Sequence, residues 1–211
     1  MSEEIILYRS VASRSYTALW MLEELGLTYR METVDIRAGA TRTPAYLAIN
    51  PMGKVPTLKI GDVVVTEAPA ICLFLADRYG YGTFAPKVDD PERGAYLRWS
   101  VFAASVLEPA MTLKARDIEL PARQVGWGSF EDAVRTLSGA LGGHSFIVGE
   151  RMTAADVIVG SAVGFGLFNK MLPEEPALVA YNEAMSARPA QKKAGELTWP
   201  PELMSELAAR Q

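Results

Sequence analysis

The sequence predicts an α/β domain followed by an all-α domain. In the first 80 residues, short apolar runs typical of strands alternate with two amphipathic helical segments. After residue 91, apolar residues recur at helical spacing. Strands followed by helices indicate segregated domains rather than one alternating sheet. We therefore expect a first domain at residues 1–80, a Gly- and Asp-containing linker at 81–90 and a helical domain at 91–211.

Composition and charge exclude several functional classes. The 211 residues are 49% hydrophobic and 22% charged, which suits an ordinary globular protein of one large or two small domains. Lys and Arg number 21 against 25 Asp and Glu, and no basic run is present, so nucleic acid and anionic membranes are not expected partners. The longest apolar stretch, residues 157–168, is shorter than the roughly 20 residues that span a bilayer.

Cysteine and histidine usage narrows the chemistry further. Cys72 is the sole cysteine, so no intrachain disulfide can form and a reducing compartment is expected. The acidic start of the chain lacks the basic and apolar segments of a secretory signal, which favours a cytoplasmic protein. His144, the sole histidine, follows two glycines and is expected in a solvated loop. No Cys or His pair has ligand spacing, so no metal site is expected.

A strand, a helix and a second strand open the first domain. The helix between the two strands lets them run parallel, and Gly26 is placed to end it. Two strands joined by Gly61 and Asp62 then form a hairpin, and a helix closes the domain. This is the order of a thioredoxin-like domain. The expected strands are Ile5–Tyr8, Tyr29–Val34, Val55–Ile60 and Val63–Val65, and the expected helices are Tyr16–Leu25 and Ala70–Tyr79.

Four helices are expected after the linker, at about residues 92–111, 130–141, 149–168 and 177–187. Within the third of these, Thr153 is followed three residues later by Asp156, which is the spacing of a capping box. The role expected for this box is in folding rather than in chemistry.

Three short motifs place polar groups at the ends of the expected strands. Residues 7–15 read LYRSVASRS and lead from the first strand into the first helix. Residues 50–58 read NPMGKVPTL and precede the hairpin, and residues 66–71 read TEAPAI and open the next helix. Each motif is weak alone, but their order and spacing, together with the capping box, extend over most of the chain.

Together these motifs resemble those of the cytosolic glutathione S-transferase family, in a bacterial-type form with a serine in the active-site loop. The resemblance implies that the first domain binds glutathione as a co-substrate, without a metal, and that the helical domain forms the pocket for a hydrophobic electrophile. It also implies a homodimer, joined between the first domain of one subunit and the helical domain of the other.

The resemblance assigns activation of the glutathione thiol to Ser13, which lies five residues after Tyr8, as in theta-like members. A free thiol has a pKa of about 8.5, and lowering it by about 2 units requires about 2.7 kcal/mol of preferential stabilisation of the thiolate. A hydroxyl donor beside a helix N-terminus can supply much of this. Tyr8 is the rival, because tyrosine-type members carry their donor at this strand end. A helix N-cap is the structural alternative for Ser13, and a core aromatic is the alternative for Tyr8.

The other glutathione contacts also follow from the resemblance. The Val55–Pro56 bond is expected to be cis, which turns the backbone N–H and C=O of Val55 outward to pair with the cysteinyl backbone. Lys54 flanks this turn, and Arg14 is placed to hold a peptide carboxylate, although exposed surface positions are the alternative for both.

Residues 67 and 68 follow the family only in part. Glu67 matches the acid of the Glu-Ser pair that holds the γ-glutamyl amine and carboxylate, but Ala68 replaces the serine. One hydrogen bond is therefore lost, while the backbone N–H groups at the helix start remain available.

The electrophile pocket is assigned to the first loop and to the first helix of the second domain, with a core role as the alternative for the helix residues. The assigned residues are Val11, Ala12, Tyr96, Trp99, Phe102 and Ala103.

Conjugation of glutathione to an electrophilic carbon is the leading function. A glutathione-dependent isomerase, dehalogenase or peroxidase on the same scaffold is an alternative, and the Ala68 departure keeps a non-catalytic binding or regulatory module open. Thiol–disulfide exchange is disfavoured, because Cys72 lies in the apolar stretch 71–75, away from the first loop.

Overall fold

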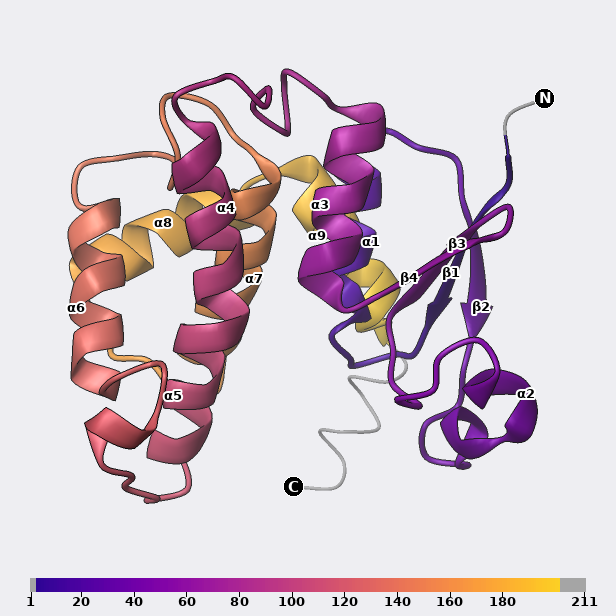
Figure 1. The fold of residues 1–211 in the computed structure, drawn as a ribbon, viewed down its shortest axis with the longest axis horizontal. Coiled ribbons are helices and arrows are strands. Elements are labelled where there is room, and N and C mark those ends of the chain that lie inside the picture. Colours follow the sequence, from indigo (N-terminus) through magenta and orange to yellow (C-terminus); the bar gives the residue numbers. More distant parts are fainter. Residues whose placement is uncertain (1–2, 202–211) are drawn as a thin grey trace. The chain divides into compact units, whose positions relative to one another are not determined.

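Four short strands form one mixed sheet in the computed structural model, which describes residues 3–201 (Figure 1). The strand order is β2-β1-β3-β4. β1 is parallel to β2 and antiparallel to β3, and β3 is antiparallel to β4. The strands are β1 (Ile5–Arg9), β2 (Arg30–Thr33), β3 (Thr57–Ile60) and β4 (Val63–Thr66). This arrangement confirms the predicted thioredoxin-like domain, with strand ends within two residues of those expected.

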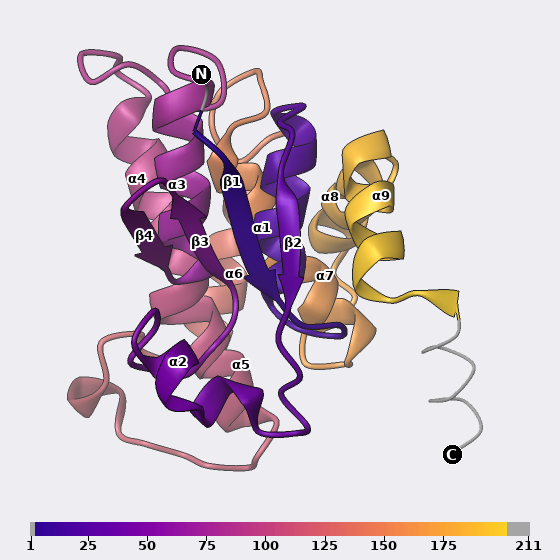
Figure 2. The same ribbon diagram turned by 90° about the vertical axis from the view of Figure 1, so that its right-hand side faces the viewer.

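Two helices cover one face of this sheet, α1 (Ser15–Glu24) and α3 (Ala68–Tyr79) (Figure 2). The alternation of β1 explains the arrangement, because Ile5 and Leu7 are buried while Ile6 and Tyr8, on the opposite face, are half-buried. The predicted helices at 16–25 and 70–79 are thus confirmed to within two residues.

The polar stretch between β2 and β3 contains two short helical segments that the sequence did not predict. They are a 3₁₀ turn, η1 (Ala40–Arg42), and the four-residue helix α2 (Pro44–Leu47). Thr43 caps α2 by accepting a hydrogen bond from the backbone N–H of Tyr46 at 3.3 Å, and Pro44 occupies the first helical position. A single helical turn is too short to produce a recognisable hydrophobic period.

The chain divides into two compact units, and the division differs from the predicted domain boundaries at 1–80, 81–90 and 91–211. Among the described residues, one unit contains 3–75 together with 189–201, and the other runs from Ala76 to Arg188. One difference arises from α9 (Pro189–Thr198), which was not predicted and which packs on α1 of the first unit. The other is that the first unit ends at Leu75, before the predicted linker. The domain boundaries expected from the sequence therefore stay a prediction.

The second unit is all helical, as predicted. The expected helix at 92–111 is a continuous helical run in three parts, α4 (Arg93–Phe102), a π turn η2 (Ala103–Leu107) and α5 (Glu108–Lys114). Pro109 explains the wide turn, because it has no N–H to donate and its ring clashes with the carbonyl four residues earlier. The other helical elements are η3 (Ala122–Gln124), α6 (Phe130–Leu141), α7 (Ala154–Phe168) and α8 (Pro176–Ser186).

The predicted capping box is present, but it lies at the start of α7. Thr153 is the N-cap, and the predicted helix start at Gly149 was wrong because Gly149 has a left-handed φ of 58° in the preceding turn. Asp156 is fully buried and accepts hydrogen bonds from the backbone N–H groups of Ile147 and Thr153, both at 2.8 Å. The Tyr181 hydroxyl donates to the same carboxylate at 3.0 Å.

Several expectations about single residues can be placed on this fold. Cys72 is buried, and His144 is exposed in a loop. Between residues 3 and 201, no helix has the length and apolar character required to cross a bilayer. The same residues contain no cluster of His, Cys, Asp and Glu arranged to hold a metal ion.

Candidate functional site

Strand register brings the three motifs of the first domain to one end of the sheet. Tyr8, near the end of β1, pairs with Thr57 at the start of β3, and Thr57 pairs with Thr66 at the end of β4. The loop that contains Ser13, the Val55–Pro56 turn and the start of α3 all extend from this end. Because both pairings are antiparallel, three segments far apart in the sequence converge there.

The Ser13 hydroxyl lies in a hydrogen-bonded turn directly before α1. Its Oγ donates to the backbone carbonyl of Ser10 at 2.7 Å or to Oγ of Ser15 at 2.9 Å, and it accepts from the Ser15 N–H at 3.2 Å. The side chain is half-buried, whereas Ser15 is fully buried. Ser13 precedes Arg14, which is the N-cap of α1, so the N-cap alternative for Ser13 was wrong. Its hydroxyl lies near the N-terminus of a ten-residue helix, and its role in thiol activation stays a prediction.

Tyr8 lies on the sheet face opposite to α1 and α3. Its ring meets that of Tyr46 edge-on, with ring centroids 6.1 Å apart. This packing accounts for an aromatic residue at the strand end, and it is the alternative that the sequence left open for Tyr8.

The Val55–Pro56 peptide bond is cis, as the resemblance implied. Pro56 is buried, Val55 is half-buried and Lys54 is exposed. Within the described part of the chain, no hydrogen bond joins the backbone N–H or C=O of Val55. Both groups are therefore available to a ligand that carries its own peptide backbone.

Two side chains hold this turn in place, and sequence reasoning missed the role of both. The Tyr46 hydroxyl donates to the Lys54 carbonyl at 2.6 Å, and the amide of Asn50 donates to the same carbonyl at 2.9 Å. The Asn50 amide also donates to Oγ1 of Thr57 at 2.9 Å. Gly53 completes the turn with a φ of 60°, and a Cβ there would lie 2.7 Å from a backbone oxygen. The Asn-Pro-x-Gly pattern in the sequence indicated the turn. No local pattern indicated that Tyr46 contacts it.

The third motif forms the start of α3. Glu67 is exposed and adopts a left-handed φ of 66°, and its carbonyl accepts the N–H of Ile71 at 2.9 Å. The N–H groups of the first turn have no partner within the helix. Ala68 stands at the first position of the helix and supplies no hydroxyl there. Arg14, half-buried, is the residue before α1.

The residues assigned to the electrophile pocket divide into two groups. Tyr96, Trp99 and Ala103 are buried, as the core alternative expects, and their assignment to the pocket stays a prediction. Phe102 is half-buried and packs edge-on against Trp99, with ring centroids 5.1 Å apart. In the first loop, Val11 is half-buried and Ala12 is exposed.

The thiol of Cys72 is buried and lies outside the candidate site. Burial raises the pKa of Cys72, whose Sγ lies 3.7 Å from the carbonyl of Thr17. A thiol held neutral in an apolar interior is a poor nucleophile. The geometry therefore offers a hydroxyl donor, two free backbone groups and a helix N-terminus, which suit a ligand with a peptide backbone, an anionic end and an ionisable group.

Comparison with known proteins places this arrangement in a family. A family model described as the glutathione S-transferase N-terminal domain matches residues 13–78. A glutathione S-transferase of Arabidopsis thaliana is 31% identical over 121 residues, which cover 56% of this chain and 55% of that protein. The chain spans about half the length of the first curated relatives that it matches, 55% and 50%.

Solved structures extend the likeness over nearly the whole chain. A glutathione transferase homologue from Lodderomyces elongisporus, 21% identical, shares the fold with a TM-score of 0.77 over 94% of this chain and 100% of that chain. A glutathione S-transferase from Actinobacillus pleuropneumoniae is 30% identical with a TM-score of 0.74, and the alignment covers 92% of both chains. The chain described here belongs to the glutathione S-transferase family.

Proposed function

We propose that this protein is a glutathione transferase that activates the glutathione thiol with Ser13 for attack on a hydrophobic electrophile. The observation that carries the proposal is the strand register, which brings Ser13, Val55 and the start of α3 to one end of the sheet. The free N–H and C=O of Val55 pair with the cysteinyl backbone, and this places the thiol toward the Ser13 loop. The N-terminus of α3, with Glu67, receives the γ-glutamyl end.

Hydrogen-bond energies favour donation by the Ser13 hydroxyl to a bound thiolate over donation to its present neutral acceptor. In the free protein this hydroxyl donates to a neutral acceptor, the Ser10 carbonyl or Ser15 Oγ. A neutral hydrogen bond of this kind is worth about 0.5–1.5 kcal/mol net, whereas one to a charged group is worth about 1.5–3 kcal/mol. Turning the hydroxyl to a thiolate therefore gains about 1–1.5 kcal/mol. The start of α1 adds about 0.3–1 kcal/mol, so together they lower the thiol pKa by about 1–2 units.

A titration of the bound thiol tests this assignment. We expect glutathione bound to the wild-type protein to show thiolate absorbance at a pH about 1–2 units below that of free glutathione. Ser13→Ala should move the midpoint back toward the free value and reduce turnover about 10- to 100-fold, with a small change in the Michaelis constant for glutathione. Tyr8→Phe is the matched variant, because it also removes a single hydroxyl, and it should leave the titration unchanged.

The reverse pattern would move the catalytic role to Tyr8. Absence of glutathione binding at millimolar concentration would refute the transferase and favour the non-catalytic module that Ala68 keeps open. Saturable binding and a normal thiolate, without turnover on aromatic halides, would direct the search to epoxides, halogenated alkanes, peroxides and isomerisable substrates.

The electrophile is proposed to meet Val11 and Ala12, which keep exposed surface in the loop that contains Ser13. Apolar side chains next to the attacking sulfur favour a hydrophobic substrate. The contribution of the helical unit, from Phe102 in particular, stays a prediction.

A homodimer is proposed as well, in line with the family. Exposed apolar side chains support it on both units, Val63 and Val64 on β4 and Leu97 and Val101 on α4, the last two being 42% and 57% exposed. Size-exclusion chromatography with light scattering should show a dimer for the wild type and a monomer for Leu97→Asp. Phe168→Asp, at a residue that is 81% exposed on α7, is the control that should stay dimeric. A wild-type monomer would refute the proposal.

A further inference from the structure

The end of α9 is hydrogen-bonded to the loop that contains Ser13. The N–H of Ala12 donates to the carbonyl of Thr198, the last residue of α9, at 2.9 Å. The other hydrogen bonds of this loop described above stay within the loop and the first turn of α1. Ala12 immediately precedes Ser13, so this bond fixes the chain one residue away from the hydroxyl proposed to activate the thiol.

Ala12 requires such support because its backbone is in the left-handed region, with a φ of 47°. A residue with a Cβ adopts this conformation at a cost of about 1–2 kcal/mol, and it persists where surrounding contacts fix it. A hydrogen bond from its own N–H to the end of a helix is a contact of this kind. It also satisfies one of the last helical carbonyls, which have no partner inside the helix.

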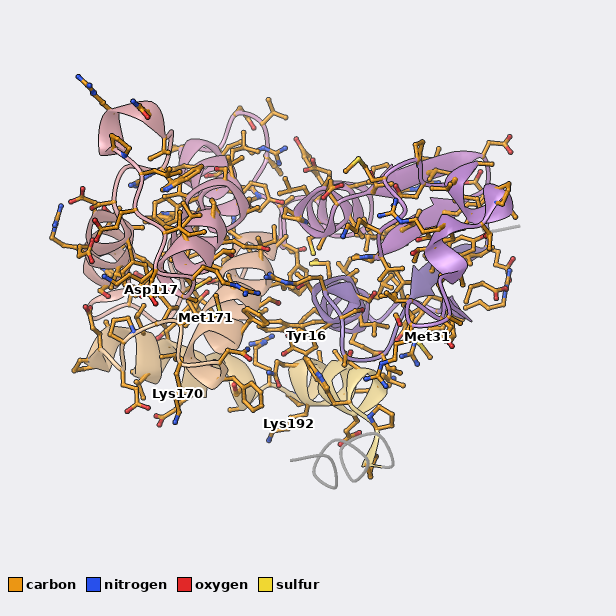
Figure 3. All side chains as sticks on the ribbon, turned by 90° about the horizontal axis from the view of Figure 1, so that it is seen from below. Tyr16, Met31, Asp117, Lys170, Met171 and Lys192 are labelled. Atoms are coloured by element: carbon orange, nitrogen blue, oxygen red, sulfur yellow. The ribbon has the colours of Figure 1, made fainter. Side chains whose placement is uncertain are left out.

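The position of α9 is itself fixed along the whole length of α1. At one end, the ring of Trp199 lies against that of Tyr16, with ring centroids 5.0 Å apart. The Tyr16 hydroxyl is hydrogen-bonded to the side chain of Gln191, and Figure 3 shows Tyr16 between α1 and α9. At the other end, Lys193 pairs with Glu23 at 2.8 Å.

The ion pair is more than a surface contact. Glu23 is only 11% exposed, and its second oxygen accepts a hydrogen bond from the Tyr29 hydroxyl at 2.5 Å. The two helices run antiparallel, because Lys193 meets the end of α1 while Trp199 meets its start. These contacts at both ends hold α9 in one position on α1, and the end of α9 in turn contacts the Ser13 loop.

We propose that α9 positions the active-site loop, and that Trp199 is a positioning residue for thiol activation. It acts through Tyr16 and through the Thr198 carbonyl, which holds Ala12 and so aims the Ser13 hydroxyl. This inference rests on the proposed function of Ser13. Trp199 does not have to contact glutathione, and its loss should affect ionisation of the thiol more than binding of the tripeptide.

The test compares wild type, Trp199→Ala and Trp199→Phe, with Phe168→Ala as the control for loss of an exposed aromatic. Trp199 is 38% exposed, so the alanine variant is expected to fold. In Trp199→Ala the pH midpoint of thiol ionisation in bound glutathione should rise by about 0.5–1 unit. At neutral pH, where the wild-type thiol is already partly ionised, this lowers turnover about two- to eightfold. The Michaelis constant for glutathione should change less than twofold, as a rough bound, because the contacts of Val55 and α3 are untouched. Trp199→Phe, which keeps an aromatic ring against Tyr16, should restore the wild-type titration.

A second measurement needs no glutathione. Exchange of the Ala12 amide hydrogen should be about tenfold faster in Trp199→Ala than in the wild type and near normal in Trp199→Phe. An unchanged thiol midpoint or an unchanged Ala12 exchange rate in Trp199→Ala would overturn the inference. If wild type itself failed to ionise bound glutathione, the proposed function would fall. The exchange comparison would then still decide whether α9 fixes the loop.

Discussion

Replacing Asp156 with alanine should strongly destabilise the helical unit, although the residue lies outside the proposed glutathione site. The carboxylate is fully buried and serves as the acceptor for the N–H of Ile147, the N–H of Thr153 and the hydroxyl of Tyr181, all within 2.8–3.0 Å. These donors come from the turn before α7, from its N-cap and from α8. A single side chain therefore joins two helices and the segment that leads into them.

The magnitude follows from the donors that would lose their acceptor. A buried donor without a partner costs about 1–3 kcal/mol. Two backbone N–H groups and two hydroxyls are affected, because the Thr153 hydroxyl also donates to this carboxylate, at 3.2 Å. Because water can enter the space left by the carboxylate and satisfy part of them, we expect a loss of about 3–5 kcal/mol in the free energy of unfolding. Burial raises the pKa of Asp156, and the Ile147 and Thr153 N–H groups and the Tyr181 and Thr153 hydroxyls oppose that rise.

Urea denaturation followed by circular dichroism measures this loss. With a slope of about 2 kcal/mol per molar urea, the midpoint should fall by about 2 M. The chain offers a matched control in Asp132, which stands three residues after the N-cap Ser129 of α6 in the same spacing but is exposed. Asp132→Ala should leave the midpoint nearly unchanged. Equal shifts for the two variants would refute the argument from buried donors.

Three other changes have outcomes that follow from the same structure. Ala68→Ser adds a hydroxyl at the start of α3 and should tighten glutathione binding about fivefold by calorimetry, whereas Ala70→Ser, exposed in the same turn, should not. Burial raises the pKa of Cys72, so the thiol should resist a disulfide reagent at neutral pH in the native protein and react once the chain is denatured. A rapid reaction in the native protein would contradict its burial. Gly166→Ala places a Cβ 2.6 Å from Leu172, so chemical denaturation should show a loss of about 1–3 kcal/mol.

The elements that the sequence predicted well have a strong local signal. The alternation in β1 and the glycine-containing turn of the hairpin identify the strands without knowledge of the rest of the chain. The cis Val55–Pro56 bond was predicted from motif resemblance and is confirmed. The role of Ser13, predicted in the same way, stays a prediction. The capping box of Thr153 and Asp156 was also visible, although the helix boundary was placed too early because the apolar period extends beyond the cap.

The elements that escaped prediction depend on contacts distant in sequence. α9 is polar, and the residues buried along it, such as Ala194 and Thr198, are small, so its helical period is weak. Its place on α1 is set by Trp199 and Lys193, whose partners lie more than 160 residues away, at Tyr16 and Glu23. Likewise, no local pattern marks Tyr46 as the residue that holds the Lys54 carbonyl. The strand register that assembles the site had to be observed.

Two non-glycine residues in the left-handed region lie at the end of the sheet where the candidate site is assembled. They are Ala12, before α1, and Glu67, before α3. Each costs folding free energy of about 1–2 kcal/mol, which a glycine would largely avoid. Strain of this kind is retained where surrounding structure over-determines the backbone, and it gathers at ligand sites. At Ala12 the supporting contact is the Thr198 carbonyl, and at Glu67 it is the first hydrogen bond of α3. Ala12 directly precedes Ser13, and Glu67 is itself assigned to the γ-glutamyl end of glutathione. Loss of either supporting hydrogen bond should therefore change glutathione binding or thiol ionisation more than it changes the stability of the fold.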